Sequence, residues 1–178
     1  MKKVIVLILI VLFTAAYAFS IQGGDRNRFF FIAGMGYASS HPEGLLLETG
    51  VEIRLFGKIH ARILLDHYFG SGIEKESETV KHMNGVTLYA LYKMRVTETI
   101  NFRVKAGGHY TSVKSEITML GLTFTATKAD IGFCGGAGFT VQLSNTLYLF
   151  SEITIKHLML DEPWTWVKGE VGVMYRFR

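Results

Sequence analysis

Apolar and polar residues alternate along most of this chain with few interruptions. In residues 47–57, LETGVEIRLFG, every second residue is uncharged, and the intervening positions include Glu48, Glu52 and Arg54. Successive side chains of an extended strand point to opposite faces of that strand. The segment therefore predicts a strand with one apolar face and one charged face.

Segments of this kind recur and are separated by short runs rich in turn residues. They predict eight strands, over residues 28–38, 45–56, 58–69, 84–96, 99–113, 128–143, 146–158 and 165–177. Short connections at 56–58, 97–99 and 144–146 alternate with longer ones at 39–44, 70–83, 114–127 and 158–165. An antiparallel up-and-down meander with turns at one end and loops at the other produces this alternation. With no helical period, linker or repeat, the pattern indicates one domain.

The two faces of the predicted strands differ in charge. The apolar register carries no Asp, Glu, Lys or Arg, whereas the opposite register carries most of the strand glycines. We expect the charged side chains of this second register to form one network, composed of Glu48, Glu52, Arg54, Arg62, Asp66, Lys93, Arg95, Arg103, Lys105, Glu152, Lys156, Lys168, Glu170 and Arg176.

Alternation alone does not decide which face lies inside. The aromatic residues of the apolar face favour a barrel in a membrane, because aromatic side chains gather at the two water–lipid interfaces. They predict one girdle at the turn end, formed by Phe29, Phe31, Phe102, Tyr175 and Phe177. They predict another at the loop end, formed by Tyr37, Phe69 and Tyr110.

Glycines that share a face with long charged residues favour the same orientation, because a narrow barrel must fill its interior with side chains. A closed barrel is also the only strand structure that pairs all its backbone groups in lipid. The sequence therefore predicts an all-β protein, an eight-stranded antiparallel up-and-down transmembrane β-barrel. The alternatives are a soluble lipocalin-like barrel, with its apolar face inside, and an exported β-sandwich.

The N-terminal segment predicts export. Lys2 and Lys3 precede an apolar run over residues 4–13, and Ala16 and Ala18 provide a small-x-small cleavage site. This is the organisation of a secretory signal peptide. We expect residues 1–18 to be removed and residues 19–178 to form the barrel domain. The alternative is an uncleaved anchor helix, for which the apolar run is short.

Composition removes several classes of function. The formal charge is +4 and falls to about +2 without Lys2 and Lys3. The chain has no Lys/Arg cluster with interleaved aromatic residues, so we expect no nucleic-acid partner. Cys134 is the single cysteine, which excludes an internal disulfide. Cys and His spacings match no metal finger, and we expect no metal or cofactor.

Two segments carry a resemblance to a known family. The segments FCGGAGFTVQLSNTLYLFSEITI at 133–155 and GEVGVMYRF at 169–177 resemble the small outer-membrane β-barrels of the OmpA-transmembrane and OmpX type. The resemblance implies the outer membrane of a Gram-negative-type bacterium, with outer-membrane lipids around the barrel and both chain ends in the periplasm. It also implies recognition of the C-terminal strand by the barrel-assembly machinery. One departure from the family pattern is that Arg178 follows Phe177, whereas such barrels usually end on an aromatic residue; the spacing of Tyr175 and Phe177 is kept.

Three features are candidates for function. The interior charges predict a structural plug or, alternatively, a narrow porin-like channel of low conductance. The histidines allow a lipid A- or phospholipid-modifying enzyme, but no Ser accompanies His67 or His157 in the arrangement that such chemistry needs. Residues 111–128 keep alternating beyond the expected bilayer height and predict a projecting hairpin whose edge could receive an extracellular protein partner. The alternative is an ordinary mobile surface loop. We therefore expect a non-enzymatic barrel with a structural or surface-interaction role.

Overall fold

The computed structural model describes residues 29–39, 44–70, 74–75, 78–119, 122–159 and 164–177. The predicted signal peptide, with Ala16 and Ala18, and Arg178 lie outside these residues. The described residues form strands alone, namely β1 (Phe29–Ser39), β2 (Gly44–Phe56), β3 (Ile59–Gly70), β4 (Glu74–Lys75), β5 (Glu78–Arg95), β6 (Ile100–Met119), β7 (Leu122–Gln142), β8 (Leu147–Leu158) and β9 (Trp164–Arg176).

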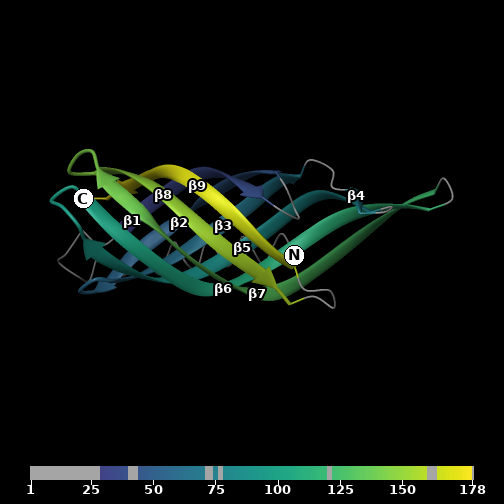
Figure 1. The fold of residues 1–178 in the computed structure, drawn as a ribbon, viewed down its shortest axis with the longest axis horizontal. Helices are drawn as coiled ribbons and strands as arrows, with labels where there is room; N and C mark the ends of the chain where they lie inside the picture. Colours follow the sequence, from purple (N-terminus) through teal and green to yellow (C-terminus); the bar gives the residue numbers. More distant parts are fainter. Residues whose placement is uncertain are drawn as a thin grey trace.

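The strands close into a barrel (Figure 1). Apart from β3 and β4, strands that follow one another along the chain pair antiparallel; β3 pairs with β5, and β9 pairs with β1 to close the ring. The two-residue strand β4 pairs only with the first residues of β5, outside the closed ring. The eight-stranded antiparallel up-and-down barrel predicted from the sequence is confirmed. In the part of the chain that the structure describes, no helix is long and apolar enough to cross a membrane.

Five of the strands begin and end close to the predicted positions, while β5, β6 and β7 are longer than predicted. β6 continues to Met119 and β7 begins at Leu122, so the two strands form one long hairpin. Figure 1 shows this hairpin projecting beyond the other strands, at the right of the view. The first residues of β5 extend with it and pair with β6. The sequence predicted the hairpin but missed β4, which lies in a charged segment without alternation.

The strands are tilted, because pairing is staggered around the ring. A path of directly paired residues that leaves β1 at Phe29 returns to β1 at Ser39, ten residues further along the strand (39 − 29). For eight strands, stagger of this kind produces an interior just wide enough for side chains to fill. The lumen is therefore a packed core.

The apolar register faces outward along the whole barrel. Met35, Leu88, Ile153 and Val171 are each more than half exposed, whereas the residues of the opposite register are mostly buried. A β-barrel with large aliphatic side chains over its outer surface and charged ones inside is inverted relative to a water-soluble barrel.

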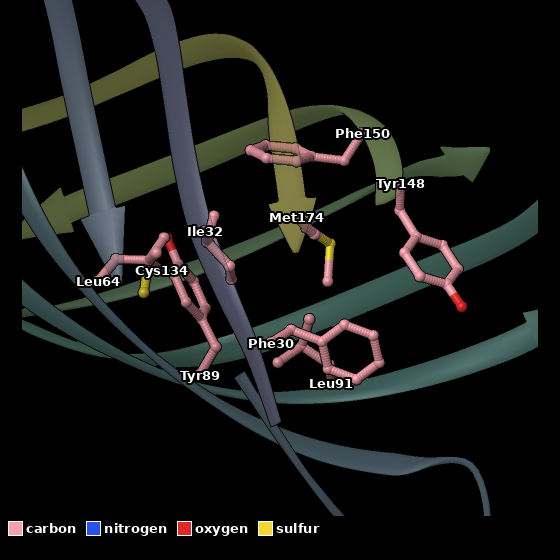
Figure 2. Packing of buried hydrophobic residues seen from close by; sticks show 9 residues of the cluster. All are labelled: Phe30, Ile32, Leu64, Tyr89, Leu91, Cys134, Tyr148, Phe150 and Met174. Atoms are coloured by element: carbon pink, nitrogen blue, oxygen red, sulfur yellow. The ribbon is translucent and has the colours of Figure 1, made fainter. Parts of the chain in front are cut away.

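Apolar side chains share the lumen with the charges, which the sequence analysis did not anticipate. Near the turn end, β1 contributes Phe30 and Ile32, and rings from other strands surround them (Figure 2). At the loop end, Trp166 lies against Tyr68, and its indole nitrogen donates a hydrogen bond of 3.0 Å to the tyrosine hydroxyl. The first cluster contains Phe30, Ile32, Leu64, Tyr89, Leu91, Cys134, Tyr148, Phe150 and Met174, and the second contains Ala38, Leu46, Tyr68, Met83, Val113, Leu158 and Trp166.

Inward-facing glycines are required where neighbouring strands come closest. A Cβ atom at Gly107 would overlap the carbonyl oxygen of Leu88, whereas one at the outward-facing Gly108 would lie 3.5 Å from the nearest described atom, the carbonyl oxygen of Gly132. We expect Gly107→Ala to lower the free energy of unfolding by about 1–3 kcal/mol, because the added methyl group must displace backbone. Urea unfolding of the protein folded in detergent micelles measures the change.

Gly108→Ala is the matched control for this prediction. Its added methyl group makes only an ordinary van der Waals contact, so we expect a change within about 0.5 kcal/mol. Equal destabilisation by the two substitutions would contradict the proposed close approach at Gly107.

Candidate functional site: the charged interior

Acidic and basic side chains from six strands meet in the lumen. They come from alternate positions of β2, β3, β5, β6, β8 and β9, which the strand period points inward. The acids are at most 3% exposed, and every base except Lys93 is at most 5% exposed. We call this set the interior network; its members are Glu48, Glu52, Asp66, Glu152 and Glu170, with Arg62, Lys93, Arg103, Lys105, Lys156 and Lys168.

Glu52 and Arg62 organise the half of the network nearest the turns. One carboxylate oxygen of Glu52 accepts hydrogen bonds of 2.7 and 3.0 Å from the Arg62 guanidinium, and Arg103 lies 3.4 Å from the same oxygen. The other oxygen pairs with Lys93 and lies 3.0 Å from His60 Nδ1. Glu52 is thus surrounded by four basic side chains.

Arg62 also crosses the lumen. Its second terminal nitrogen donates hydrogen bonds of 3.0 and 3.1 Å to the two carboxylate oxygens of Glu152, which belongs to β8. Glu152 accepts further bonds from Arg103 and Lys105. Arg62 therefore connects β2, β3 and β8, strands that are not all neighbours in the ring.

Lys168 and Asp66 organise the half nearest the loops. Lys168 pairs with Glu48, lies 2.8 Å from Glu170 and lies 3.6 Å from Asp66. Asp66 also pairs with Lys156 and accepts a hydrogen bond of 2.6 Å from the Thr87 hydroxyl. Because Lys105 pairs with both Glu152 and Glu170, the two halves form one continuous network.

Aromatic rings of the lumen lie against the bases. The guanidinium carbons of Arg62 and Arg103 are 5.7 and 5.5 Å from the ring centre of Phe150. Lys105 lies 4.7 Å from the ring centre of Tyr89. A cation within about 6 Å of a ring face is stabilised by the ring quadrupole. The sequence analysis missed these rings, although they occupy the same register as the charges.

Three of the residues predicted for the network lie elsewhere. Arg54 and Arg95 are exposed, and their side chains donate hydrogen bonds to the carbonyl oxygens of Gly57 at 3.1 Å and Thr97 at 3.2 Å. Arg176 is half-buried and donates to the carbonyl oxygen of Asn145. All three have the inward register but stand at strand ends next to turns, beyond the closed part of the lumen, so they bind turn carbonyls.

The second apolar cluster lies at the loop end of the network, whereas the first lies among its charges. At the loop end, the ring of His109 also lies across Trp166, with ring centres 5.6 Å apart. In the first cluster, Phe30 packs edge-on against Tyr148 with ring centres 5.7 Å apart, and Lys93 lies 4.8 Å from the ring centre of Phe30. Apolar side chains therefore lie among the charges and beyond them at the loop end.

The residues predicted for the aromatic girdles lie on the outer face of the barrel. At the turn end, Phe31, Tyr175 and Phe177 are more than two fifths exposed, and Phe29 and Phe102 are partly exposed. Phe102 pairs with Phe139, and their ring centres are 5.2 Å apart. Phe139 therefore adds to this girdle, although it was not among the residues predicted for it. At the loop end, the exposed rings are those of Tyr37, Phe69 and Tyr110.

The histidines form hydrogen bonds within the strands. His109 Nε2 donates to the carbonyl oxygen of His157 at 3.2 Å, so its Nδ1 accepts from the Thr111 hydroxyl at 2.8 Å. His157 Nδ1 lies 2.7 Å from the Thr165 hydroxyl. Over the described ranges, no group of three or more His, Cys, Asp or Glu residues could hold a metal ion.

No protein-family model matches the chain, and no curated protein matches it. Solved structures do match. The N-terminal β-barrel domain of OprF from Pseudomonas aeruginosa aligns with a TM-score of 0.66 and 14% identity, over 84% of this chain and 96% of that one. Neisserial surface protein A, NspA, aligns with a TM-score of 0.63 and 13% identity, over 84% and 97%.

Ail, the attachment invasion locus protein of Yersinia pestis, aligns with a TM-score of 0.54 and 12% identity, over 84% of this chain and 97% of that one. The chain covers nearly the whole length of each of these structures. It therefore has the fold of the small outer-membrane β-barrels, as the sequence resemblance implied.

Proposed function

We propose that this protein is a non-enzymatic outer-membrane barrel that presents the β6–β7 hairpin at the cell surface. The observation that carries the proposal is a lumen filled by paired charges, inside a barrel whose outer face is apolar. Lipid requires such an outer face, and the closed ring of strands leaves no unpaired sheet edge within it. The predicted signal peptide and the fold shared with OprF and NspA support the same location.

The lengths of the connections support one orientation. The turns between β2 and β3, β5 and β6, and β7 and β8 lie at one end, and the projecting hairpin lies at the other. Outer-membrane barrels have short turns in the periplasm and long loops outside. We therefore infer that residues 111–128 face the cell exterior.

The interior network stabilises the barrel as a plug. A buried charge without a partner is strongly destabilising, and a pair is favourable only when its geometry is good and its remaining hydrogen bonds are made. Glu52 and Glu152 each contact three or more bases, so the two clusters of partners hold opposite walls of the barrel together. Apolar side chains among these charges, and a second apolar cluster at the loop end, favour a plug over a path for ions.

The hairpin supplies the surface for interaction. The pairing of β7 with β8 begins at Gly132. Residues 124–130 of β7 lie before this point, and among the described strands they pair only with β6. A strand with a free edge can receive an extended segment of another protein as an additional strand. Ail, whose name refers to attachment, has the same barrel fold, which supports an attachment role here.

A narrow channel is the second candidate. The network has six bases and five acids, and a surplus positive charge in a lumen would favour anions. The apolar side chains that share the lumen with the charges disfavour this candidate.

Arg62→Met tests whether the network acts as a structural plug. The substitution removes the bridge between Glu52 and Glu152 and leaves these carboxylates buried with fewer partners. We expect the free energy of unfolding to fall by about 3–5 kcal/mol, measured by urea unfolding in micelles. Arg54→Met is the control, with an expected change within about 0.5 kcal/mol, because Arg54 is exposed. Similar losses in both variants would refute this role.

Electrical recording separates the plug from the channel. We expect the folded barrel, inserted in a planar bilayer, to give no steady conductance at moderate voltage, because paired charges and aromatic rings fill the lumen. The control is the same detergent added without protein. Steady, large, anion-selective steps would support the channel in place of the plug.

Deletion of residues 116–126 tests the role of the hairpin. The deleted segment lies outside the closed ring, so we expect the barrel to fold and insert as before, seen as an unchanged heat-dependent shift on SDS gels. Cells displaying the full barrel are expected to adhere to host-matrix surfaces, and cells displaying the deletion variant are expected to lose this adhesion. The Arg54→Met barrel, displayed at the same level, is the control. Equal adhesion by all three would exclude the attachment role.

A further inference from the structure

A polar patch interrupts the apolar outer face at the loop end. Along adjacent strands, His67 of β3 pairs with Asn84 of β5, and His82 of β5 pairs with Lys114 of β6. On its other side, His67 pairs with the exposed Leu47 of β2. We call His67, His82, Asn84 and Lys114 the outer polar patch; its members all belong to the outward register.

The patch borders the aromatic girdle. His82 pairs with Phe69, and the ring of Phe69 packs edge-on against His67 with ring centres 4.4 Å apart. Tyr110, another member of the girdle, pairs with Val86, two residues from Asn84 on the same face. Aromatic girdles of membrane barrels lie at the level of the lipid headgroups. The patch therefore stands where the hydrocarbon gives way to the headgroups.

The hydrogen bonds of the patch leave donors available to a ligand. The side-chain oxygen of Asn84 can only accept, so Nδ1 of His67 donates to it. This bond leaves the Asn84 amide nitrogen with two hydrogens to donate. The rings of His67 and His82 are stacked with centres 6.1 Å apart. Asn84, His82 and Lys114 are exposed, and His67 is partly exposed.

The charge of the patch selects an anion. On the described outward faces of β2, β3, β5 and β6, the charged side chains are those of Lys114 and Glu116. Glu116 lies two residues beyond Lys114, toward the tip of the hairpin and away from the girdle. The side facing the membrane therefore combines the Lys114 ammonium group and the Asn84 amide donor, next to the imidazoles of His67 and His82. Phosphate oxygens are strong acceptors for the ammonium and amide groups.

We propose that the outer polar patch binds the phosphate of an anionic lipid in the outer leaflet of the membrane. This inference rests on the membrane location proposed above. A headgroup phosphate stands beside the aromatic girdle at the height of His67, Asn84 and Lys114, and its acyl chains then cover Leu47 and Val86. Such a lipid satisfies polar groups that would otherwise adjoin hydrocarbon.

The lipid selectivity of the reconstituted barrel tests whether this site exists. The full barrel is reconstituted in phosphatidylcholine vesicles, and electron spin resonance gives the association of spin-labelled phosphatidylglycerol relative to spin-labelled phosphatidylcholine. We expect phosphatidylglycerol to be preferred about fivefold, the effect of one basic residue near a membrane surface. The triple variant with His82→Leu, Asn84→Leu and Lys114→Met is expected to lower this ratio to about one. Lys58→Met, which removes an exposed base at the turn end, is expected to keep it.

The outcomes distinguish this inference from the proposed function. Failure of the wild-type barrel to insert into vesicles would overturn both. Insertion with an unchanged ratio in the triple variant, or an equal loss in Lys58→Met, would overturn the lipid site alone. Loss of the preference on adding millimolar inorganic phosphate would also overturn it, by showing a site for soluble anions.

Discussion

Pairing between buried acids and buried bases is the interaction on which this barrel depends. Eight tilted strands enclose a lumen that only side chains can fill, and half of the strand positions point into it. Arg62 satisfies Glu52 and Glu152 at once, and Lys105 joins Glu152 to Glu170. Without this pairing, each charge would stand in a medium that cannot solvate it.

Aromatic residues make the charged lumen possible in two ways. Phe150 lies against both Arg62 and Arg103 and stabilises cations that have lost their water. Trp166 and Tyr68 fill the lumen at the loop end of the network. Charged and aromatic side chains therefore share one packed interior.

The hairpin of β6 and β7 shows where the environment of the chain changes. Within the barrel, Tyr110 and Ile131 face outward and are exposed, while Thr111 faces inward. Beyond them most outward positions are polar, and exposed Phe124 lies in the inward register, which also carries Lys128 and Asp130. The outward face of these two strands therefore changes from apolar to mostly polar. In the proposed membrane location, such a change is expected where a strand leaves lipid for water.

The sequence by itself determined the strand pattern, because a period of two residues assigns every side chain to a face. The aromatic residues and glycines then indicated a closed barrel with its charges inside. Only the tertiary structure decided which charges meet. Arg54, Arg95 and Arg176 share the register of the network, yet tilt and stagger place them beside turn carbonyls. Register fixes the face of a residue, whereas its height and its partners across the lumen depend on how eight strands close.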